Sequence, residues 1–177
     1  MRIVSGIHKG RRITAPKKLP VRPTTDFAKE GLFNILHHRY RLSNLEVLDL
    51  FSGTGNIAYE FGSRGAKSIT AVDAHAACIK FISKTSEELD LPIMPVKTDA
   101  FKFLDATAAT FDIIFADPPY NFDQEMLQKL ANLVFERNLL KEDGALIIEH
   151  HKKLDLSETD HFSEARKYGN SMFSFFR

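Results

Sequence analysis

Short apolar runs and amphipathic segments alternate along most of the 177-residue chain. An apolar run of five or six residues, bounded by acidic residues, glycine or proline, is typical of a strand buried on both faces of a parallel sheet. Such runs lie at residues 47–51, 68–72, 93–97, 111–116 and 145–149. Amphipathic helical segments lie at 56–64, 74–89, 101–106 and 123–135. The alternation predicts an α/β fold with a mostly parallel sheet covered by helices on both faces.

Two further elements are expected before and after this alternating region. A helix through about His38 is expected to follow Thr24 or Thr25, because either threonine is a good N-cap and the apolar residues after them share one face. Near the other end, residues 166–168 and 172–176 flank a Gly-Asn turn, which predicts an antiparallel hairpin. The hairpin brings the expected sheet to seven strands.

The N-terminal segment has a different composition from the rest of the chain. Residues 2–4 and 12–14 are expected to form a small hairpin or an extended arm. We therefore divide the chain into a basic N-terminal arm or hairpin at residues 1–24 and a single domain at residues 25–177. Seven basic residues precede the first acid, which leaves 17 basic against 23 acidic residues in the remainder. An arm of this charge favours a polyanion partner, and a solvated tail is the alternative. The candidate contacts to such a polyanion are Arg2, Lys9, Arg11, Arg12 and Arg22.

Composition sets further limits on the class of protein. Hydrophobic residues make up 44% and charged residues 27% of the chain, which is ordinary for one globular domain. A single cysteine, Cys78, excludes an intramolecular disulfide and is expected to be a buried apolar residue. The chain shows neither a signal-peptide core nor an apolar run approaching 18 residues. We expect a cytoplasmic protein without membrane segments, and a monomer by default.

A glycine-rich turn follows the first strand of the alternating region. Residues 49–55 read DLFSGTG, and a helix is expected directly after them. A strand, a tight turn and a helix N-terminus form a ligand-binding corner in doubly wound folds. The GxGxxG pattern that accommodates a pyrophosphate is absent. Such a corner can also be only a tight turn, so its interpretation depends on the residues that follow.

Acidic residues lie at the ends of the first three strands, where ligands bind in open α/β sheets. Asp49 can face an ammonium group, Asp73 can accept hydrogen bonds from ribose hydroxyls, and Asp99 can accept one from an adenine amine. Each alone could be a turn or cap residue. Together they indicate a ligand with a ribose, an adenine and a cationic amino group, which is S-adenosyl-L-methionine.

Residues 117–120 read Asp-Pro-Pro-Tyr and follow the fourth strand. Pro118 and Pro119 fix the backbone, so Asp117 and the Pro118 carbonyl can accept both hydrogen bonds of an exocyclic amine. Tyr120 offers a flat face to a base that has left its stack. A rigid loop without chemistry is the alternative. A metal site is not expected, because the His150-His151 pair lacks neighbouring ligands and is expected to be exposed at a strand end.

The motifs together resemble a known family. DLFSGTG, Asp73, Asp99-Ala100 and DPPY, in this order, resemble Rossmann-like class I methyltransferases that act on exocyclic amines. MRIVSG, GRRI, VRPTTD, LFNIL and SRGA resemble the RsmD family over essentially the whole chain. That resemblance implies methylation of N2 of a guanine in 16S ribosomal RNA, within the small subunit. Phe27 and Lys29 stand where the family commonly has arginines.

The resemblance also implies roles for individual residues. The catalytic set, which would hold the target guanine, is Asp117, Pro118, Pro119 and Tyr120. The cofactor-binding set is Thr24, Thr25, Asp49, Phe51, Ser52, Gly53, Gly55, Asp73, Asp99 and Ala100. We expect direct in-line methyl transfer without a metal or a covalent enzyme intermediate. The alternatives are a DNA adenine-N6 methyltransferase, which would share DPPY, and a non-catalytic RNA-binding factor for ribosome assembly.

Overall fold

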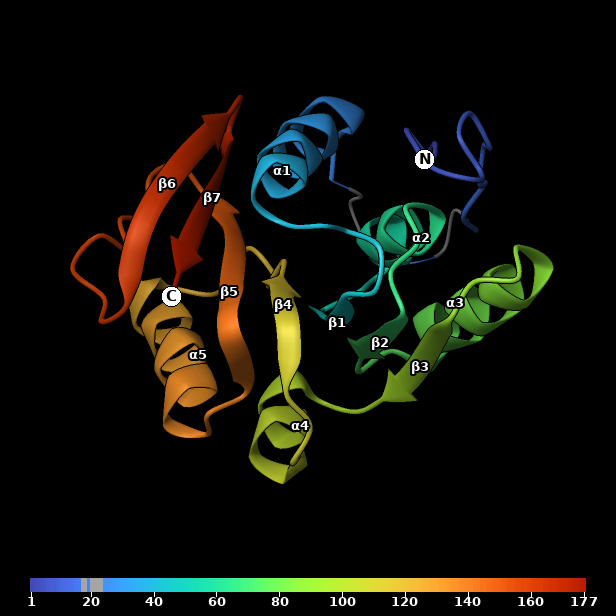
Figure 1. The fold of residues 1–177 in the computed structure, drawn as a ribbon. Coiled ribbons are helices and arrows are strands. Elements are labelled where there is room, and N and C mark those ends of the chain that lie inside the picture. Colours follow the sequence, from blue (N-terminus) through green and yellow to red (C-terminus); the bar gives the residue numbers. More distant parts are fainter. Residues whose placement is uncertain (17–18, 20–23) are drawn as a thin grey trace.

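The computed structural model describes residues 1–16, 19 and 24–177, and Figure 1 shows its arrangement. A seven-stranded sheet has the order β3-β2-β1-β4-β5-β7-β6. Its strands are β1 (Glu46–Leu50), β2 (Ser68–Asp73), β3 (Ile93–Lys97), β4 (Phe111–Ala116), β5 (Leu140–His151), β6 (Phe162–Tyr168) and β7 (Ser171–Phe176). The helices are α1 (Asp26–Arg39), α2 (Asn56–Ser63), α3 (Ala76–Glu88), α4 (Ala100–Ala106) and α5 (Gln124–Glu136).

The strand directions confirm the predicted fold class. Strands β3, β2, β1, β4 and β5 pair in parallel, and β7 pairs antiparallel with both β5 and β6. The strand order reverses direction between β1 and β4, because the chain leaves β1 toward β2 and β3 and then returns to the other side of β1. In open α/β sheets the ligand crevice lies at the carboxyl ends of the strands at such a reversal.

Two apolar layers cover the sheet, as expected for strands with side chains pointing alternately to both faces. On one face, Val47 of β1 belongs to the core that buries α1, α2 and part of α3. On the other face, Leu48 belongs to the core that includes α4 and α5. Figure 1 shows α1, α2 and α3 on one side of the sheet and α4 and α5 on the other. None of the helices within the described residues is long and apolar enough to span a membrane.

Several local predictions are confirmed and one is wrong. Thr25 caps α1, since its side chain accepts a hydrogen bond from the Ala28 N–H at 3.2 Å, and Cys78 is buried. His150 was expected to be exposed, but only 7% of it is accessible. Its Nε2 lies 2.8 Å from the Ser174 hydroxyl of β7. The expectation failed because it took the strand to end at residue 149, whereas β5 continues to His151 alongside β7.

The first 13 residues of the N-terminal segment pack against α2. Arg2 and Arg12 form a single antiparallel bridge in the segment where a small hairpin or an extended arm was expected. Ile3 and Ile13 are buried in the same core as α1 and α2. The backbone N–H groups of Val4 and Ser5 donate to the carboxylate of Glu60 in α2, at 2.9 and 3.0 Å. The first residues of the chain are therefore held by apolar burial and by one carboxylate.

Lys29 completes this junction from α1. Its side chain is 1% exposed, and its Nζ lies 3.3 Å from Glu60 Oε2. The same ammonium group donates to the Arg2 carbonyl at 2.6 Å and to Asn56 Oδ1 at 2.8 Å. Burial lowers the pKa of Lys29, and the Glu60 carboxylate opposes that shift. Lys29 therefore contacts protein groups that join α1, α2 and the N-terminal segment.

Candidate active site

The glycine-rich turn between β1 and α2 has the backbone of a ligand-binding corner. Phe51, Gly53 and Gly55 have φ angles of 58°, 53° and 79°, in the left-handed region that glycine adopts most readily. A Cβ atom on Gly55 would also lie 2.7 Å from the Tyr59 ring. The Ser52 hydroxyl donates to the carbonyl oxygen of Asp49 at 2.6 Å. The turn thus holds the N-terminus of α2 and its free N–H groups at the carboxyl edge of the sheet.

Asp73, at the end of β2, fixes this corner. One carboxylate oxygen accepts the Gly53 N–H at 2.8 Å, and the other accepts the His75 N–H at 2.7 Å. Each carboxylate oxygen has a second lone pair, so the side chain can still accept from ligand hydroxyls. Asp73 is therefore both part of the turn's structure and a candidate ligand contact.

Asp49 is a buried carboxyl without a counter-ion among the described residues. It is 2% exposed, and its Oδ2 accepts no hydrogen bond from the part of the chain that the structure describes. Burial raises the pKa of Asp49 to about 8, and repulsion by Asp73 adds to the rise. An unpaired buried carboxylate is costly, so a positively charged ligand group beside the glycine corner would stabilise it. This is the chemistry expected of the methionine end of S-adenosylmethionine.

The other predicted cofactor residues lie on both sides of the corner. Asp99 caps α4 by accepting the Lys102 N–H at 3.1 Å and is exposed, while Ala100 beside it is buried. Thr24 is tied to the start of α2, because its carbonyl accepts from Asn56 Nδ2 at 3.0 Å. Thr24 and Thr25 also line a pocket beside β4 together with the Asp-Pro-Pro-Tyr loop.

That pocket has a volume of about 280 Å³ and contains all four residues of the predicted catalytic set in its wall. Pro118 is buried, whereas Tyr120 is 75% exposed at the mouth. Aromatic rings supply much of the remaining wall, namely Phe27, Phe122 and Tyr168. A pocket with flat apolar walls and a few polar groups suits a planar base.

One acidic residue of this pocket was missed in the sequence. Glu149 of β5 lines the wall and is 7% exposed. Parallel pairing aligns Ala116 with Ile148, so Asp117, which directly follows β4, is a neighbour of Glu149 on β5. Burial raises the pKa of Asp117 well above its usual value, and repulsion by Glu149 and then by Asp49 adds to the rise. The sequence signal that could have identified Glu149 is an acidic residue at the end of an apolar strand.

Among the described residues, the predicted RNA contacts line two hollows, with Arg2 and Lys9 in one and Arg11 and Arg12 in the other. Arg2 pairs with Asp26 at 3.5 Å and with Glu30 at 3.7 Å. Lys9 lines a groove of about 1100 Å³ between the N-terminal segment and the end of α1. Arg11 and Arg12 line a separate hollow against α3. Arg22 lies outside the described residues.

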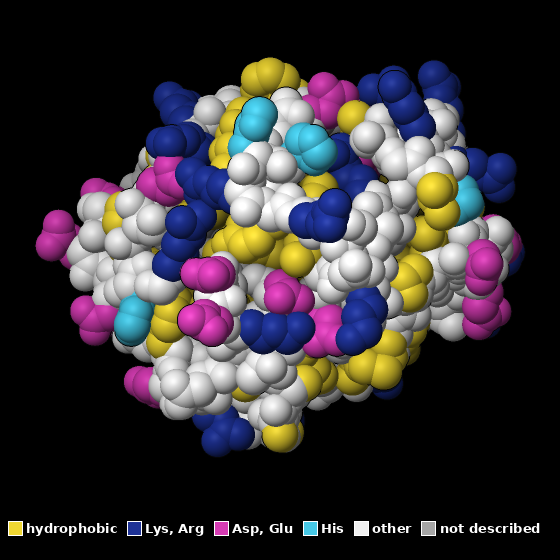
Figure 2. Space-filling view, viewed as in Figure 1, with side chains coloured by type: hydrophobic (Ala, Val, Ile, Leu, Met, Phe, Trp, Pro, Cys, Tyr) yellow, Lys and Arg dark blue, Asp and Glu magenta, His cyan; other side chains and the backbone are white. Residues whose placement is uncertain are grey.

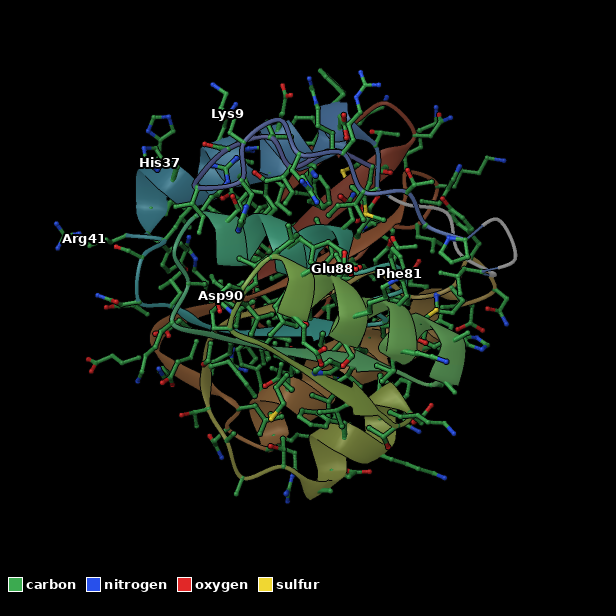
Figure 3. The ribbon with its side chains drawn as sticks, turned by 90° about the vertical axis from the view of Figure 1, so that its right-hand side faces the viewer. Lys9, His37, Arg41, Phe81, Glu88 and Asp90 are labelled. Atoms are coloured by element: carbon green, nitrogen blue, oxygen red, sulfur yellow. The ribbon has the colours of Figure 1, made fainter. Side chains whose placement is uncertain are left out.

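Several basic residues that were not predicted to contact RNA also line the groove around Lys9. Its lining also includes His37, His38, Arg39 and Arg41 from the end of α1 and the following turn. Figure 3 shows Lys9, His37 and Arg41 pointing outward at one corner of the molecule. Figure 2 shows Lys and Arg side chains around the N-terminal segment and histidines over α1 beside them. Chain folding therefore adds a second basic segment to the arm.

The sheet order, its antiparallel end and the glycine corner with its acids define a class I S-adenosylmethionine-dependent methyltransferase. The chain belongs to the RsmD family of ribosomal RNA methyltransferases, since a family model described as "Conserved hypothetical protein 95" matches residues 1–177. It is 35% identical over 164 residues to YlbH of Bacillus subtilis (strain 168), covering 90% of this chain and 87% of that protein. It is 27% identical over 180 residues to ribosomal RNA small subunit methyltransferase D of Haemophilus influenzae, covering 99% and 91%.

Solved structures show the same fold. A hypothetical protein of Thermus thermophilus superposes with a TM-score of 0.86 at 24% identity, over 100% of this chain and 99% of that chain. RsmC of T. thermophilus, a 16S rRNA N2 G1207 methyltransferase solved with AdoMet and guanosine, superposes with a TM-score of 0.72 at 22% identity. That match covers 90% of this chain and 45% of RsmC.

Proposed function

We propose that this protein transfers the methyl group of S-adenosylmethionine to the exocyclic N2 of a guanine in 16S ribosomal RNA. The observation that carries the proposal is the Asp117–Tyr120 loop in a base-sized pocket, at the same sheet edge as the glycine corner and the unpaired Asp49. The relatives named small subunit methyltransferase D support the choice of 16S RNA. The reaction would occur in the cytoplasm, with the protein acting as a monomer on the small ribosomal subunit.

The cofactor would lie across the carboxyl ends of β1, β2 and β3. Phe51, Ser52, Gly53 and Gly55 would surround its methionine end, with the Asp49 carboxylate facing the ammonium group. Further along the edge, Asp73 would accept hydrogen bonds from the ribose hydroxyls. Asp99, with Ala100 beside it, would accept one from the adenine amine. Thr24 and Thr25 would close over the cofactor from the start of α1.

In the base pocket, Asp117 and the Pro118 carbonyl would accept the two N–H bonds of the target amine. By accepting both hydrogen bonds, these two groups would make the nitrogen lone pair more available and direct it toward the cofactor side. Pro119 restrains the loop, and Tyr120 at the mouth would stack on the base. When bound, S-adenosylmethionine supplies a methyl group on a positively charged sulfur. A new N–C bond would form as the S–C bond breaks, and Asp117 would accept the amine proton that is released.

The titration of Asp49 leads to a prediction about cofactor binding. Because the pKa of Asp49 is raised to about 8, the carboxyl is mostly protonated below pH 7 in the free protein. A cationic cofactor favours the ionised form, so its affinity should rise about 20-fold between pH 6.0 and 7.5. Calorimetric titration at several pH values measures this. The Asp49→Asn variant should show a flat profile over the same range, and an equal slope in that variant would exclude Asp49 as the titrating group.

The RNA would reach the pocket across a basic surface. Lys9 and Arg41 border the large groove at the far end of α1 from Thr25 and offer contacts to phosphates outside the target nucleotide. Between Tyr120 and β5 the only helix is α5, so no additional target-reading domain interrupts the sheet there. Recognition would then depend on substrate shape and backbone contacts, as is common for structured RNA, with the target base flipped into the pocket.

A substrate comparison tests this proposal against its main alternative, a DNA adenine-N6 methyltransferase. The wild-type protein would be incubated with S-adenosylmethionine carrying a labelled methyl group. Unmodified 16S rRNA, small ribosomal subunits and duplex DNA would be offered separately. We expect label in RNA or subunits and background label in DNA. Labelled DNA with unlabelled RNA and subunits would contradict the proposal.

A further inference from the structure

The proposed pocket contains a second carboxyl that the transfer chemistry does not require. Asp117 and the Pro118 carbonyl can accept from any exocyclic amine, including N6 of adenine and N2 of guanine. Those two acceptors therefore do not decide which base is methylated. Glu149 lines the same pocket and lies next to Asp117 across the β4–β5 pairing.

The surroundings of Glu149 fix its carboxyl in place. The Thr24 hydroxyl donates to Glu149 Oε2 at 3.0 Å, and both side chains are at least nine-tenths buried. The Asn56 side chain of α2 in turn donates a hydrogen bond to the Thr24 carbonyl and so holds Thr24 in place. A carboxylate has about four acceptor positions, so the bonds from Thr24 and Ser171 leave others available toward the pocket. Burying such a group beside another carboxyl is unfavourable unless a ligand supplies donors to both.

Guanine presents the matching set of donors. Its N1–H and its N2 amine are adjacent on one edge and point in the same direction. Adenine presents an amine next to an unprotonated N1, which is an acceptor. A carboxylate facing that position would bond with guanine and repel adenine.

We propose that Glu149 accepts the N1–H of the target guanine while Asp117 and the Pro118 carbonyl hold its N2 amine. Glu149 is then a residue that determines base specificity, and Thr24 positions it. This inference rests on the proposed function, because it assumes that the target base enters the pocket through its amine. It adds a reason, from this chain's own residues, why guanine is chosen.

The first test measures nucleoside binding by NMR, with S-adenosylhomocysteine present. Guanosine should bind wild-type protein at least about tenfold more tightly than adenosine or 1-methylguanosine, since neither of these has the N1–H that would donate to the charged carboxylate. In Glu149→Gln the affinity for guanosine should fall about tenfold. The affinity for adenosine should not fall, because the neutral amide can also donate a hydrogen bond to the unprotonated N1 of adenine. General damage to the pocket would weaken both nucleosides.

Glu142→Gln is the matched control, because Glu142 lies on the same strand but is exposed. It should retain the wild-type preference. If Glu149→Gln kept the full preference for guanosine over adenosine, the inference would be overturned. Equal affinity of the wild type for guanosine and 1-methylguanosine would also overturn it, and this second comparison needs no variant.

An activity measurement separates this inference from the proposed function. On small ribosomal subunits, Glu149→Gln should raise KM about tenfold and change the Kd for S-adenosylmethionine little. If the wild type forms N2-methylguanosine and Glu149→Gln matches it in KM, the role of Glu149 is wrong and the function stands. If the wild type forms N6-methyladenine instead, both are wrong.

Discussion

Replacing Asp117 by alanine is expected to lower kcat for methyl transfer at least about 100-fold, while the Kd for S-adenosylmethionine changes less than about threefold. The reason is positional, since Asp117 lies in the base pocket beside Pro118 and Tyr120 and is not part of the glycine corner. Loss of one positioned hydrogen-bonding group at a reacting centre commonly costs a factor of 10² to 10³. The cofactor contacts proposed at Asp49 and Asp73 remain in the variant.

Single-turnover kinetics with small subunits and calorimetry with the cofactor measure the two quantities separately. Asp117→Asn retains one acceptor oxygen and should keep more activity than Asp117→Ala. Asp105→Ala, at the exposed end of α4, is the control and should behave as wild type. Turnover of Asp117→Ala within about tenfold of wild type, equivalent to roughly 1.4 kcal/mol of barrier, would remove Asp117 from the mechanism.

Lys29→Met is expected to lower the free energy of unfolding by about 3 kcal/mol, the lower end of the cost of breaking a buried ion pair. The methionine side chain fills similar space but leaves Glu60, whose side chain is fully buried, without one of its two cationic partners. The other partner, Arg64, remains at 2.8 Å and limits the loss. The Arg2 carbonyl and Asn56 Oδ1 lose their donor as well.

Urea unfolding followed by circular dichroism measures this change. Lys84→Met is the matched control, because Lys84 pairs with Glu88 at 3.6 Å on an exposed helix surface, where such pairs contribute little. The control should change stability by less than about 0.5 kcal/mol. A loss below about 1 kcal/mol in Lys29→Met would mean that the buried network does not hold the N-terminal segment in place.

Much of the fold could be predicted because most strands of the parallel region contain a short apolar run that is buried on both faces; β3, at the sheet edge, is partly exposed. Strand β4 is an example, since its apolar run, residues 111–116, coincides with the strand. Strand β5 was predicted too short, because residues 140–144 carry charges and a glycine where its start is partly exposed. Strand β6 was recognised only from residue 166, because an edge strand at the surface does not need an apolar pattern.

The part of the candidate site that depends only on the order of the strands along the chain could be predicted. Asp49, Asp73 and Asp117 could be placed together, because the carboxyl ends of parallel strands share one edge. Glu149 could not be assigned to the pocket, since its position depends on the register between β4 and β5 and on the contact with Thr24. The basic groove depends on the packing of the N-terminal segment beside α1, which residue spacing does not reveal.

The central claim is the position of the transferred methyl group, and one measurement tests it most directly. Small ribosomal subunits lacking the modification would be incubated with the wild-type protein and S-adenosylmethionine carrying a labelled methyl group. The RNA would then be digested to nucleosides and analysed by mass spectrometry. We predict that the label appears in N2-methylguanosine and that its rate of appearance falls at least about 100-fold with Asp117→Ala. Label in N6-methyladenine, or in a guanine methylated at another atom, would contradict the account.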